Sequence, residues 1–360
     1  MRASKCRIMM AAGLVIAAGL LAVGCSDDDK PVSPINQGTW VPLGPGTSYR
    51  VNALAVYNDK LYAGGWFVTA GGDSANSIAA WDGSSWAPLG TGINYWVAAL
   101  TTFDNKLIAG GIFDTAGGVT ANSIAAWDGS SWTSLGDGTN GEVYALTVFD
   151  NRLIVGGRFT AAGGENADNI AAWDGSSWAP LGGGINGDLV ALTVYDGKLI
   201  AAGFFTAAGG DSAKYIAAWD GSSWTSLGTG TNGGIFALTV YNNKLIAGGT
   251  FTIAGGVSAN RIAAWDGSSW AAIGTGTNDR VTALIAYDNE LIAGGDFTAA
   301  GGAVASHVAT SNGVSWAPLG IGLYGYVYSL AVYNNSLIAG GYFTIVGGVN
   351  TCNIAIWTTQ

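Results

Sequence analysis

Side chains able to do catalytic chemistry are few in this sequence. His307 is the single histidine among 360 residues, which excludes a metal site built from several histidines. It falls in a slot that holds Ser, Asn, Tyr or Arg in equivalent units of the chain, so we interpret it as a variable loop position. No G-x-S-x-G nucleophile motif and no phosphate loop ending in Lys-Ser or Lys-Thr is found. We therefore expect no catalytic residue, no metal and no cofactor.

Carboxylates offer one enzymatic alternative, because two acids suffice for glycoside chemistry. A pair about 5 to 10 Å apart in an aromatic-lined pocket would favour it. The candidate acids are Glu142, Asp188 and Asp296.

Three arginines are candidates for a carboxylate-binding cluster. They belong to different units of the chain, so we expect them to be solvated separately. These residues are Arg50, Arg158 and Arg280.

A six-residue string, WDGSSW, recurs every 46 residues and organises the chain that must position these side chains. A degraded copy, SNGVSW, ends at Trp316. Repeated units share one continuous core, so residues 38–360 are predicted to form one domain. The string begins at Trp81, Trp127, Trp173, Trp219 and Trp265.

Each unit contains four β-rich runs. Asn58-Asp59 separates the first two, and these residue types tolerate the positive φ angles of tight hairpin turns. Asp82-Gly83 is interpreted as a second turn rather than as a calcium or catalytic site. In the first unit the runs are Val51–Tyr57, Leu61–Phe67, Ile78–Trp81 and Trp86–Leu89, with a glycine-rich loop over residues 70–77.

Residues 39–360 make seven such units. Seven four-stranded antiparallel sheets around one axis make an all-β fold, the β-propeller. The chain opens on a lone fourth strand over residues 38–44 and stops on a third strand that begins at Trp357. The N-terminal strand is therefore predicted to complete the last blade. An open solenoid would instead need polar capping repeats, which the sequence lacks.

The units resemble the kelch type of propeller. The resemblance rests on a double glycine such as Gly64-Gly65, an aromatic-Asp pair such as Trp81-Asp82, and a tryptophan in the fourth strand such as Trp86. It weakens at Ala202-Gly203. Bacterial and fungal surface proteins with AGGxF…IAxWDGxxW units, including the Rax2 type of fungal polarity marker, are more similar still. These resemblances imply a propeller fold and an extracytoplasmic setting, and they imply no reaction.

Aromatic residues mark one side of the predicted ring, which we call the upper face: the side with the starts of the first strands and the ends of the second strands. Thirteen of the 15 tryptophans recur in the third and fourth strands, where they are predicted to pack between blades. Trp66 and Trp96 do not, and both fall on the upper face. The hypothesis is that this face stacks on a glycan or grips a peptide, and the alternative is that its rings fill gaps under loops. The candidate binding residues are Tyr49, Arg50, Trp66, Tyr95, Trp96, Tyr324, Tyr326 and Tyr342.

The N-terminal segment has the pattern of an export signal. Three basic residues precede an apolar run over residues 8–24, which ends at Cys25. This pattern resembles a bacterial lipoprotein signal, which implies a signal peptide over residues 1–24 and acylation of Cys25, and Ser26 implies the outer membrane. Residues 25–37 are predicted to be a flexible tether. The alternative is an ordinary cleaved signal with an incidental Cys25, and either way no disulfide framework remains.

Net charge narrows the choice of partners. The chain carries a net charge of −10, and three of its 14 basic residues precede Cys25. Nucleic acid and anionic lipid both require basic side chains, so we expect neither as a partner. The sequence favours a monomeric, non-enzymatic lipoprotein of the cell envelope that binds a glycan or a protein partner and touches the membrane only through its anchor. Open alternatives are a glycan-active enzyme and a structural surface protein with no discrete ligand.

Overall fold

The computed structural model describes residues 38–346, 349–350 and 353–359. These residues form 41 β-strands and no helix. The part of the chain so described thus holds no helix long and apolar enough to cross a membrane. The predicted signal peptide (1–24), Cys25 and the predicted tether (25–37) lie outside the described residues.

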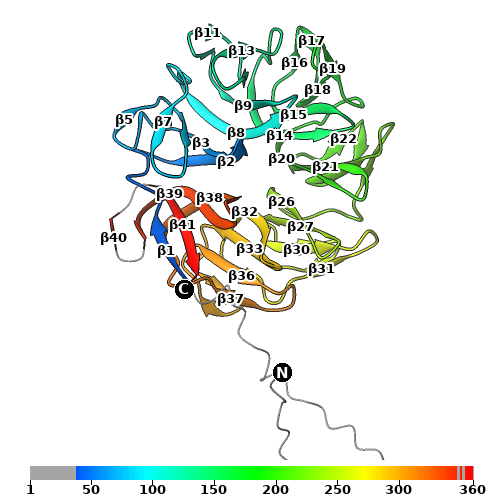
Figure 1. Cartoon of the computed structure of the whole chain (residues 1–360). Coiled ribbons are helices and arrows are strands. Elements are labelled where there is room, and N and C mark those ends of the chain that lie inside the picture. Colours follow the sequence, from blue (N-terminus) through cyan, green and yellow to red (C-terminus); the bar gives the residue numbers. More distant parts are fainter. Residues whose placement is uncertain (1–37, 347–348, 351–352, 360) are drawn as a thin grey trace, which may run out of the picture. The chain divides into compact units, whose positions relative to one another are not determined.

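Seven antiparallel sheets form a ring, so the predicted seven-bladed propeller is confirmed (Figure 1). In six blades the strands pair in chain order, and in the seventh the order is β38, β39, β41 and β1. The first strands of neighbouring blades lie side by side around the centre. The first strands are β2 (Val51–Tyr57), β8 (Trp96–Phe103), β14 (Glu142–Phe149), β20 (Asp188–Tyr195), β26 (Ile235–Tyr241), β32 (Val281–Tyr287) and β38 (Leu323–Tyr333). The second strands are β3 (Lys60–Gly65), β9 (Lys106–Ile112), β15 (Arg152–Arg158), β21 (Lys198–Phe204), β27 (Lys244–Gly249), β33 (Glu290–Gly295) and β39 (Ser336–Val346). The third strands are β6 (Ile78–Trp81), β12 (Ile124–Trp127), β18 (Ile170–Trp173), β24 (Ile216–Trp219), β30 (Ile262–Trp265), β36 (Val308–Ser311) and β41 (Ile354–Thr359). The fourth strands are β7 (Trp86–Pro88), β13 (Trp132–Ser134), β19 (Trp178–Pro180), β25 (Trp224–Ser226), β31 (Trp270–Ala272), β37 (Trp316–Pro318) and β1 (Gly38–Pro42).

The ring closes through β1, as predicted. β1 pairs antiparallel with β41, from Gly38 opposite Thr359 to Pro42 opposite Ala355, and Figure 1 shows blue β1 beside red β41. Across the same seam, the Tyr333 hydroxyl donates to the Asp59 carbonyl at 3.2 Å. The first and last blades are therefore joined by strand pairing and by side chains.

Tryptophans join neighbouring blades. The rings of Trp81 and Trp86 lie 5.4 Å apart, and Trp86 Nε1 donates to the Leu43 carbonyl at 3.2 Å. Equivalent indole-to-carbonyl bonds recur in other blades, at Trp132, Trp270 and Trp316. A buried indole needs a partner for its N–H, so this repeated bond explains why tryptophan suits the fourth strand.

The turns on the lower face, opposite the upper face, behave as their residue types predict. Asn58 and Asp59 have φ of 46° and 58°, which places both in the left-handed region of a two-residue hairpin. The Asp82 carboxylate accepts hydrogen bonds from the backbone N–H of Ser84 and Ser85, both at 2.8 Å. These bonds lower the pKa of Asp82 to about 2. The aspartate thus fixes the turn.

The structure adds small strands that the sequence did not predict. In six blades the glycine-rich loop between the second and third strands contains a pair of two-residue strands, and in the seventh β40 (Val349–Asn350) pairs with β39. In blade 1, Gly71 and Gly72 turn the pair with φ of 65° and 98°. The pairs are β4 (Thr69–Ala70) with β5 (Asp73–Ser74), β10 (Thr115–Ala116) with β11 (Val119–Thr120), β16 (Ala161–Ala162) with β17 (Glu165–Asn166), β22 (Ala207–Ala208) with β23 (Asp211–Ser212), β28 (Ile253–Ala254) with β29 (Val257–Ser258), and β34 (Ala299–Ala300) with β35 (Ala303–Val304).

Candidate functional site

A β-bulge near the start of every first strand shapes the centre of the upper face. In blade 1, Val51 pairs with Gly65 and Ala53 with Gly64, which leaves Asn52 as an extra residue. A Cβ atom at Gly65 would lie 2.2 Å from the Arg50 carbonyl oxygen, so only glycine fits opposite the bulge. A bulge re-aims a side chain. The extra residues of the seven blades are Asn52, Ala98, Tyr144, Val190, Phe236, Thr282 and Tyr328.

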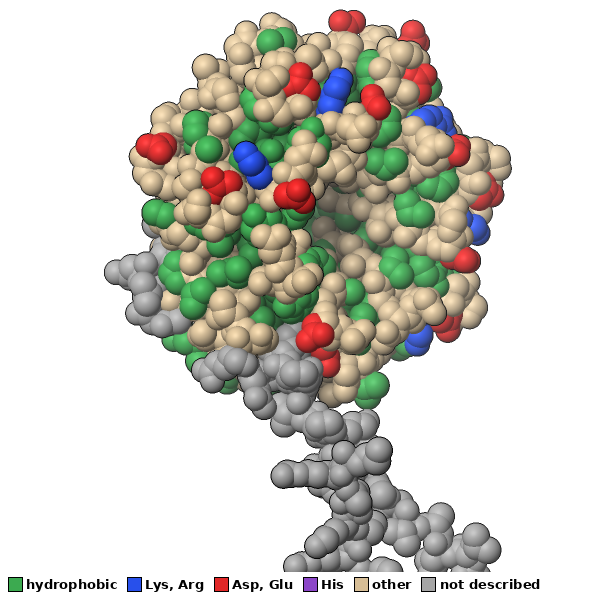
Figure 2. All heavy atoms as spheres, in the orientation of Figure 1, with side chains coloured by type: hydrophobic (Ala, Val, Ile, Leu, Met, Phe, Trp, Pro, Cys, Tyr) green, Lys and Arg blue, Asp and Glu red, His purple; other side chains and the backbone are tan. Residues whose placement is uncertain are grey.

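All seven bulge residues line one cavity of ≈ 420 Å³, which we call the mouth cavity. A second, smaller cavity of ≈ 230 Å³ adjoins it and shares four lining residues with it: Tyr144, Val190, Phe236 and Tyr328. Its other lining residues are mainly an alanine and a leucine from each first strand, such as Ala53 and Leu54. Figure 2 shows the ring hollowed at its centre. The remaining lining residues of the mouth cavity are Arg50, Trp96, Asp188, Phe204 and Arg280.

Arg50 is held between two indoles at the edge of this cavity. Its Cζ lies 5.1 Å from the ring centroid of Trp66 and 5.0 Å from that of Trp96. Trp96 is fixed in turn, because its Nε1 donates to Asn52 Oδ1 at 2.9 Å. Trp66 and Trp96 therefore lie on the same face, and both contact one cation.

A row of exposed rings continues outward from Arg50, and we call it the aromatic row: Tyr342, Tyr49, Trp66 and Tyr95. Neighbouring ring centroids in the row lie 5.1, 5.7 and 5.9 Å apart. Each of these side chains is 40–47% exposed. The row therefore presents apolar surface to solvent from blades 7, 1 and 2.

Two of the candidate binding residues lie apart from this row. Tyr326 packs edge-on against His307 with centroids 5.7 Å apart, and stacks on Tyr328 at 6.3 Å. Tyr324 is 57% exposed and makes no aromatic contact within the described ranges. Burial lowers the pKa of His307, whose Nδ1 lies 3.2 Å from the Gly295 carbonyl. The predicted binding residues thus fall into two groups: the aromatic row with Arg50 and Trp96, and, apart from them, Tyr324 and Tyr326.

The expectation that the three arginines are separately solvated is wrong for Arg50 and Arg280, which line the same cavity. Arg280 forms an ion pair with Asp296, whose side chain is 11% exposed. Arg158 instead lies 3.7 Å from Asp188 on the exposed surface. Burial raises the pKa of the Tyr328 hydroxyl in the mouth cavity, and Asp296 adds to this effect. Arg50 and Arg280 come together because the first strands of all blades meet at the axis.

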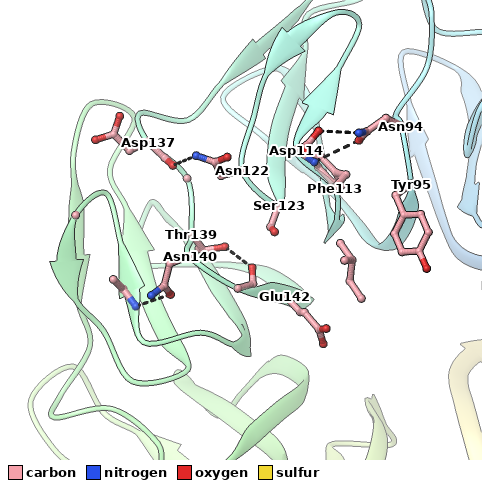
Figure 3. A pocket seen from close by; sticks show the side chains of 15 residues that line it. Asn94, Tyr95, Phe113, Asp114, Asn122, Ser123, Asp137, Thr139, Asn140 and Glu142 are labelled. Carbon is pink, nitrogen blue, oxygen red and sulfur yellow. Dashed lines mark hydrogen bonds between the residues drawn. The ribbon is translucent and has the colours of Figure 1, made fainter.

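Glu142 lies elsewhere, in a cavity of ≈ 720 Å³ between blades 2 and 3 (Figure 3). Polar side chains there bind one another: Asn94 Nδ2 donates to Asp114 Oδ1 at 2.7 Å, and Asn122 Nδ2 donates to the Asp137 carbonyl at 2.9 Å. Similar bonds recur in other blades, as at Asn186 and Thr206. These contacts hold the loop that follows a second strand against the connections that enter and leave the same blade. Within the described ranges, no three His, Cys, Asp or Glu side chains lie close enough to hold a metal ion.

The sequence analysis missed the bulge residues. A signal for them exists, because position 52 and its equivalents vary in type while the flanking positions stay apolar or small. The bulge itself could not be seen without the pairing register.

Comparison with solved structures gives the same architecture at low identity. The WD40 beta propeller domain of Doa1 is 14% identical with a TM-score of 0.58, over 89% of this chain and 97% of that one. The computationally designed Ika8 protein is 16% identical with a TM-score of 0.54, over 87% and 98%. The extracellular domain of the putative hybrid two component system BT4673 from B. thetaiotaomicron is 9% identical with a TM-score of 0.57, over 89% of this chain and 39% of that one. No curated protein matches the chain.

Comparison with protein families is more specific. Residues 84–244 and 121–288 both match the Rax2 C-terminal beta propeller domain, and together they span more than half of the 360 residues. The matched residues run from the end of blade 1 into blade 6 and contain four complete WDGSSW strings. With the repeat, the ring and the family match in agreement, this chain belongs to the family of Rax2 C-terminal beta propeller domains.

Proposed function

We propose that this protein is a non-enzymatic recognition propeller that binds a glycan or a peptide on its upper face. The observation that carries the proposal is the continuity of the aromatic row with the mouth cavity through Arg50. Exposed rings that adjoin a concave site supply contact area at small entropic cost, as recognition sites do.

A binding role is favoured over catalysis by the partners of the candidate acids. Asp296 pairs with Arg280, Asp188 lies near Arg158, and Glu142 lines the cavity between blades 2 and 3 rather than the mouth cavity. A glycosidase needs a proton donor and a second carboxylate facing one bond. Asp296 instead faces a guanidinium, and its side chain is 11% exposed.

The proposed setting is the cell envelope, where the protein would be a monomer anchored by acylated Cys25. This part of the proposal rests on the N-terminal sequence alone. Metabolic labelling with a palmitate analogue would test it, because the wild-type chain should take up label and a Cys25→Ala variant should not. Label on both the wild-type chain and Cys25→Ala, or on neither, would contradict acylation at Cys25.

The binding proposal is tested by presenting the full-length chain to a glycan array and a peptide library. Trp66→Ala and Trp96→Ala should each weaken binding of any captured ligand at least about tenfold, as loss of an aromatic anchor does. The melting curve of Trp66→Ala should change little, since Trp66 is 44% exposed. That of Trp96→Ala should shift more, since Trp96 is partly buried and donates to Asn52. Ile253→Ala is the control, because Ile253 is equally exposed at 43% but lies in blade 5.

Two outcomes would refute this proposal. One is the absence of any ligand in both libraries. The other is a large loss of stability in Trp66→Ala without any loss of binding, which would assign the ring to packing.

A further inference from the structure

The orientation of Arg50 restricts what it can bind. The Cζ atom of Arg50 lies over the rings of both Trp66 and Trp96, so two indoles hold its guanidinium in place. In-plane donors form the fork that matches a carboxylate with two parallel hydrogen bonds. A stacked arginine is also immobilised before the ligand arrives, which lowers the entropy lost on binding.

Arg50 lacks the acidic partner that Arg158 and Arg280 have. Within the described ranges it forms no ion pair and its side chain makes no hydrogen bond, and its Nε is buried without an acceptor. Arg280 and Arg158 face Asp296 and Asp188. A buried charged donor without an acceptor is costly, so a ligand that supplies an acceptor gains from it.

The rest of the mouth cavity is suited to a ring with polar edges. Trp96, Tyr144, Phe236 and Tyr328 supply apolar faces, and Asn52 supplies an amide. The volume of ≈ 420 Å³ admits a molecule of one or two rings. The net charge of −10 repels polyanions, which favours a ligand with a single negative group.

Backbone groups near Arg50 argue against a peptide. Peptides commonly bind by adding main-chain hydrogen bonds to free backbone groups. Here the Trp66 N–H already donates to the Arg50 carbonyl at 3.0 Å, and the Ser48 N–H to the Thr69 carbonyl at 2.9 Å. The aromatic row offers exposed side-chain rings instead, inclined by 53–88° to their neighbours, and sugar rings can pack on them one at a time.

We propose that the mouth cavity binds an acidic sugar residue, one pyranose ring with a single carboxylate, at the end of a glycan. The carboxylate accepts hydrogen bonds from the in-plane N–H groups of Arg50, the ring stacks on Trp96, and the following sugars lie along the aromatic row. This inference rests on the proposed recognition function and names the ligand class of the same site.

The test compares matched probes by titration calorimetry on the full-length chain. The probes are glucuronic-acid-terminated and glucose-terminated disaccharides, and sialyllactose with lactose. At least one acidic probe should bind about tenfold or more tightly than its neutral counterpart, the size expected of a charge-assisted hydrogen bond. A peptide with one carboxylate at its end serves as the competing class.

Three variants assign the preference to Arg50. Arg50→Gln should abolish it and leave neutral binding in place, whereas Arg50→Lys, which keeps the charge without the planar fork, should retain part of it. Arg152→Gln removes the same charge at the start of β15 on the lower face, and should bind like the wild type. A melting curve for each variant separates lost binding from lost folding, and Arg50→Lys keeps the test valid if Arg50→Gln does not fold.

The possible failures are distinguishable. Equal binding of acidic and neutral probes, or a preference that survives in folded Arg50→Gln, would overturn the acidic-sugar inference and leave the recognition function standing. Tighter binding of the acidic peptide than of every sugar would overturn it in favour of a peptide. No binding of any probe or library member would overturn both.

Discussion

Replacing Trp40 by alanine should open the ring at its seam. Trp40 is 1% exposed, its ring lies 5.4 Å from that of Trp357, and its Nε1 donates to the Leu319 carbonyl at 3.2 Å. An indole buries roughly 200 Å² of surface, which at about 25 cal/mol per Å² is about 5 kcal/mol. β1 is the fourth strand of the last blade, but no turn connects it to β41, the third strand of that blade. Nothing covalent therefore holds β1 in place within the blade.

The expected loss in free energy of unfolding is about 4 kcal/mol, because partial collapse of the site offsets some of the lost burial. At roughly 2 cal/mol/K of unfolding entropy per residue, the melting temperature should fall by about 6 °C. Urea unfolding followed by circular dichroism measures the first quantity, and thermal melting measures the second.

Hydrogen exchange identifies where the damage occurs. In Trp40→Ala the amides of β1 and β41 should exchange first, because the strand pair opens before the rest of the ring. Trp132→Ala is the matched control: Trp132 is 4% exposed and makes the same indole-to-carbonyl bond, to Leu89, but β13 follows its own third strand through a tight turn. A loss below about 1 kcal/mol, or β1 amides protected as in the wild type, would refute the closure argument.

Three further predictions concern the bulge, the lower turns and the seam. Gly65→Ala should cost about 3 kcal/mol by thermal melting, since its Cβ would lie 2.2 Å from the Arg50 carbonyl oxygen; a wild-type melting curve would show that the bulge can yield. Asp82→Asn should make the urea midpoint fall less steeply as the pH is lowered. An asparagine can hold this turn, because Asn312 accepts the equivalent backbone hydrogen bonds in the sixth blade. The reason is that the pKa of Asp82 is lowered from 3.8 to about 2, so the turn contributes fully above about pH 4 and loses its contribution as pH falls toward 2; an unchanged acid decline would contradict this. Tyr333→Phe should lower the free energy of unfolding by about 1 kcal/mol through loss of the bond to the Asp59 carbonyl, and an unaltered urea midpoint would count against that bond.

The ring could be predicted from the sequence because its determinants are local and repeated. The Asn58-Asp59 turn is specified by two adjacent residue types, and the copies of each turn repeat that information. The closing strand could be predicted by counting the strands of each unit. The first unit begins with an extra fourth strand, and the last unit lacks a fourth strand, so the two complement each other.

The mouth cavity could not be predicted in this way because its determinants are distant. Arg50 and Arg280 come together only because blades 1 and 6 both reach the axis. Asn52 faces the cavity because of a one-residue bulge, and strict alternation along the strand gives no hint of it. The stacking of Trp66 and Trp96 on one arginine likewise depends on the spacing between two blades.

The leucines of the first strands set how deep a charged group can travel into the disc. Below the mouth the passage is walled by Leu54, Leu100 and their counterparts in every blade, with alanine or serine between them. The space falls from ≈ 420 Å³ in the mouth cavity to ≈ 230 Å³ between these side chains. A ligand that fills the mouth cavity is therefore too bulky to pass whole between the leucines, and its charged group stays at the level of the bulge residues.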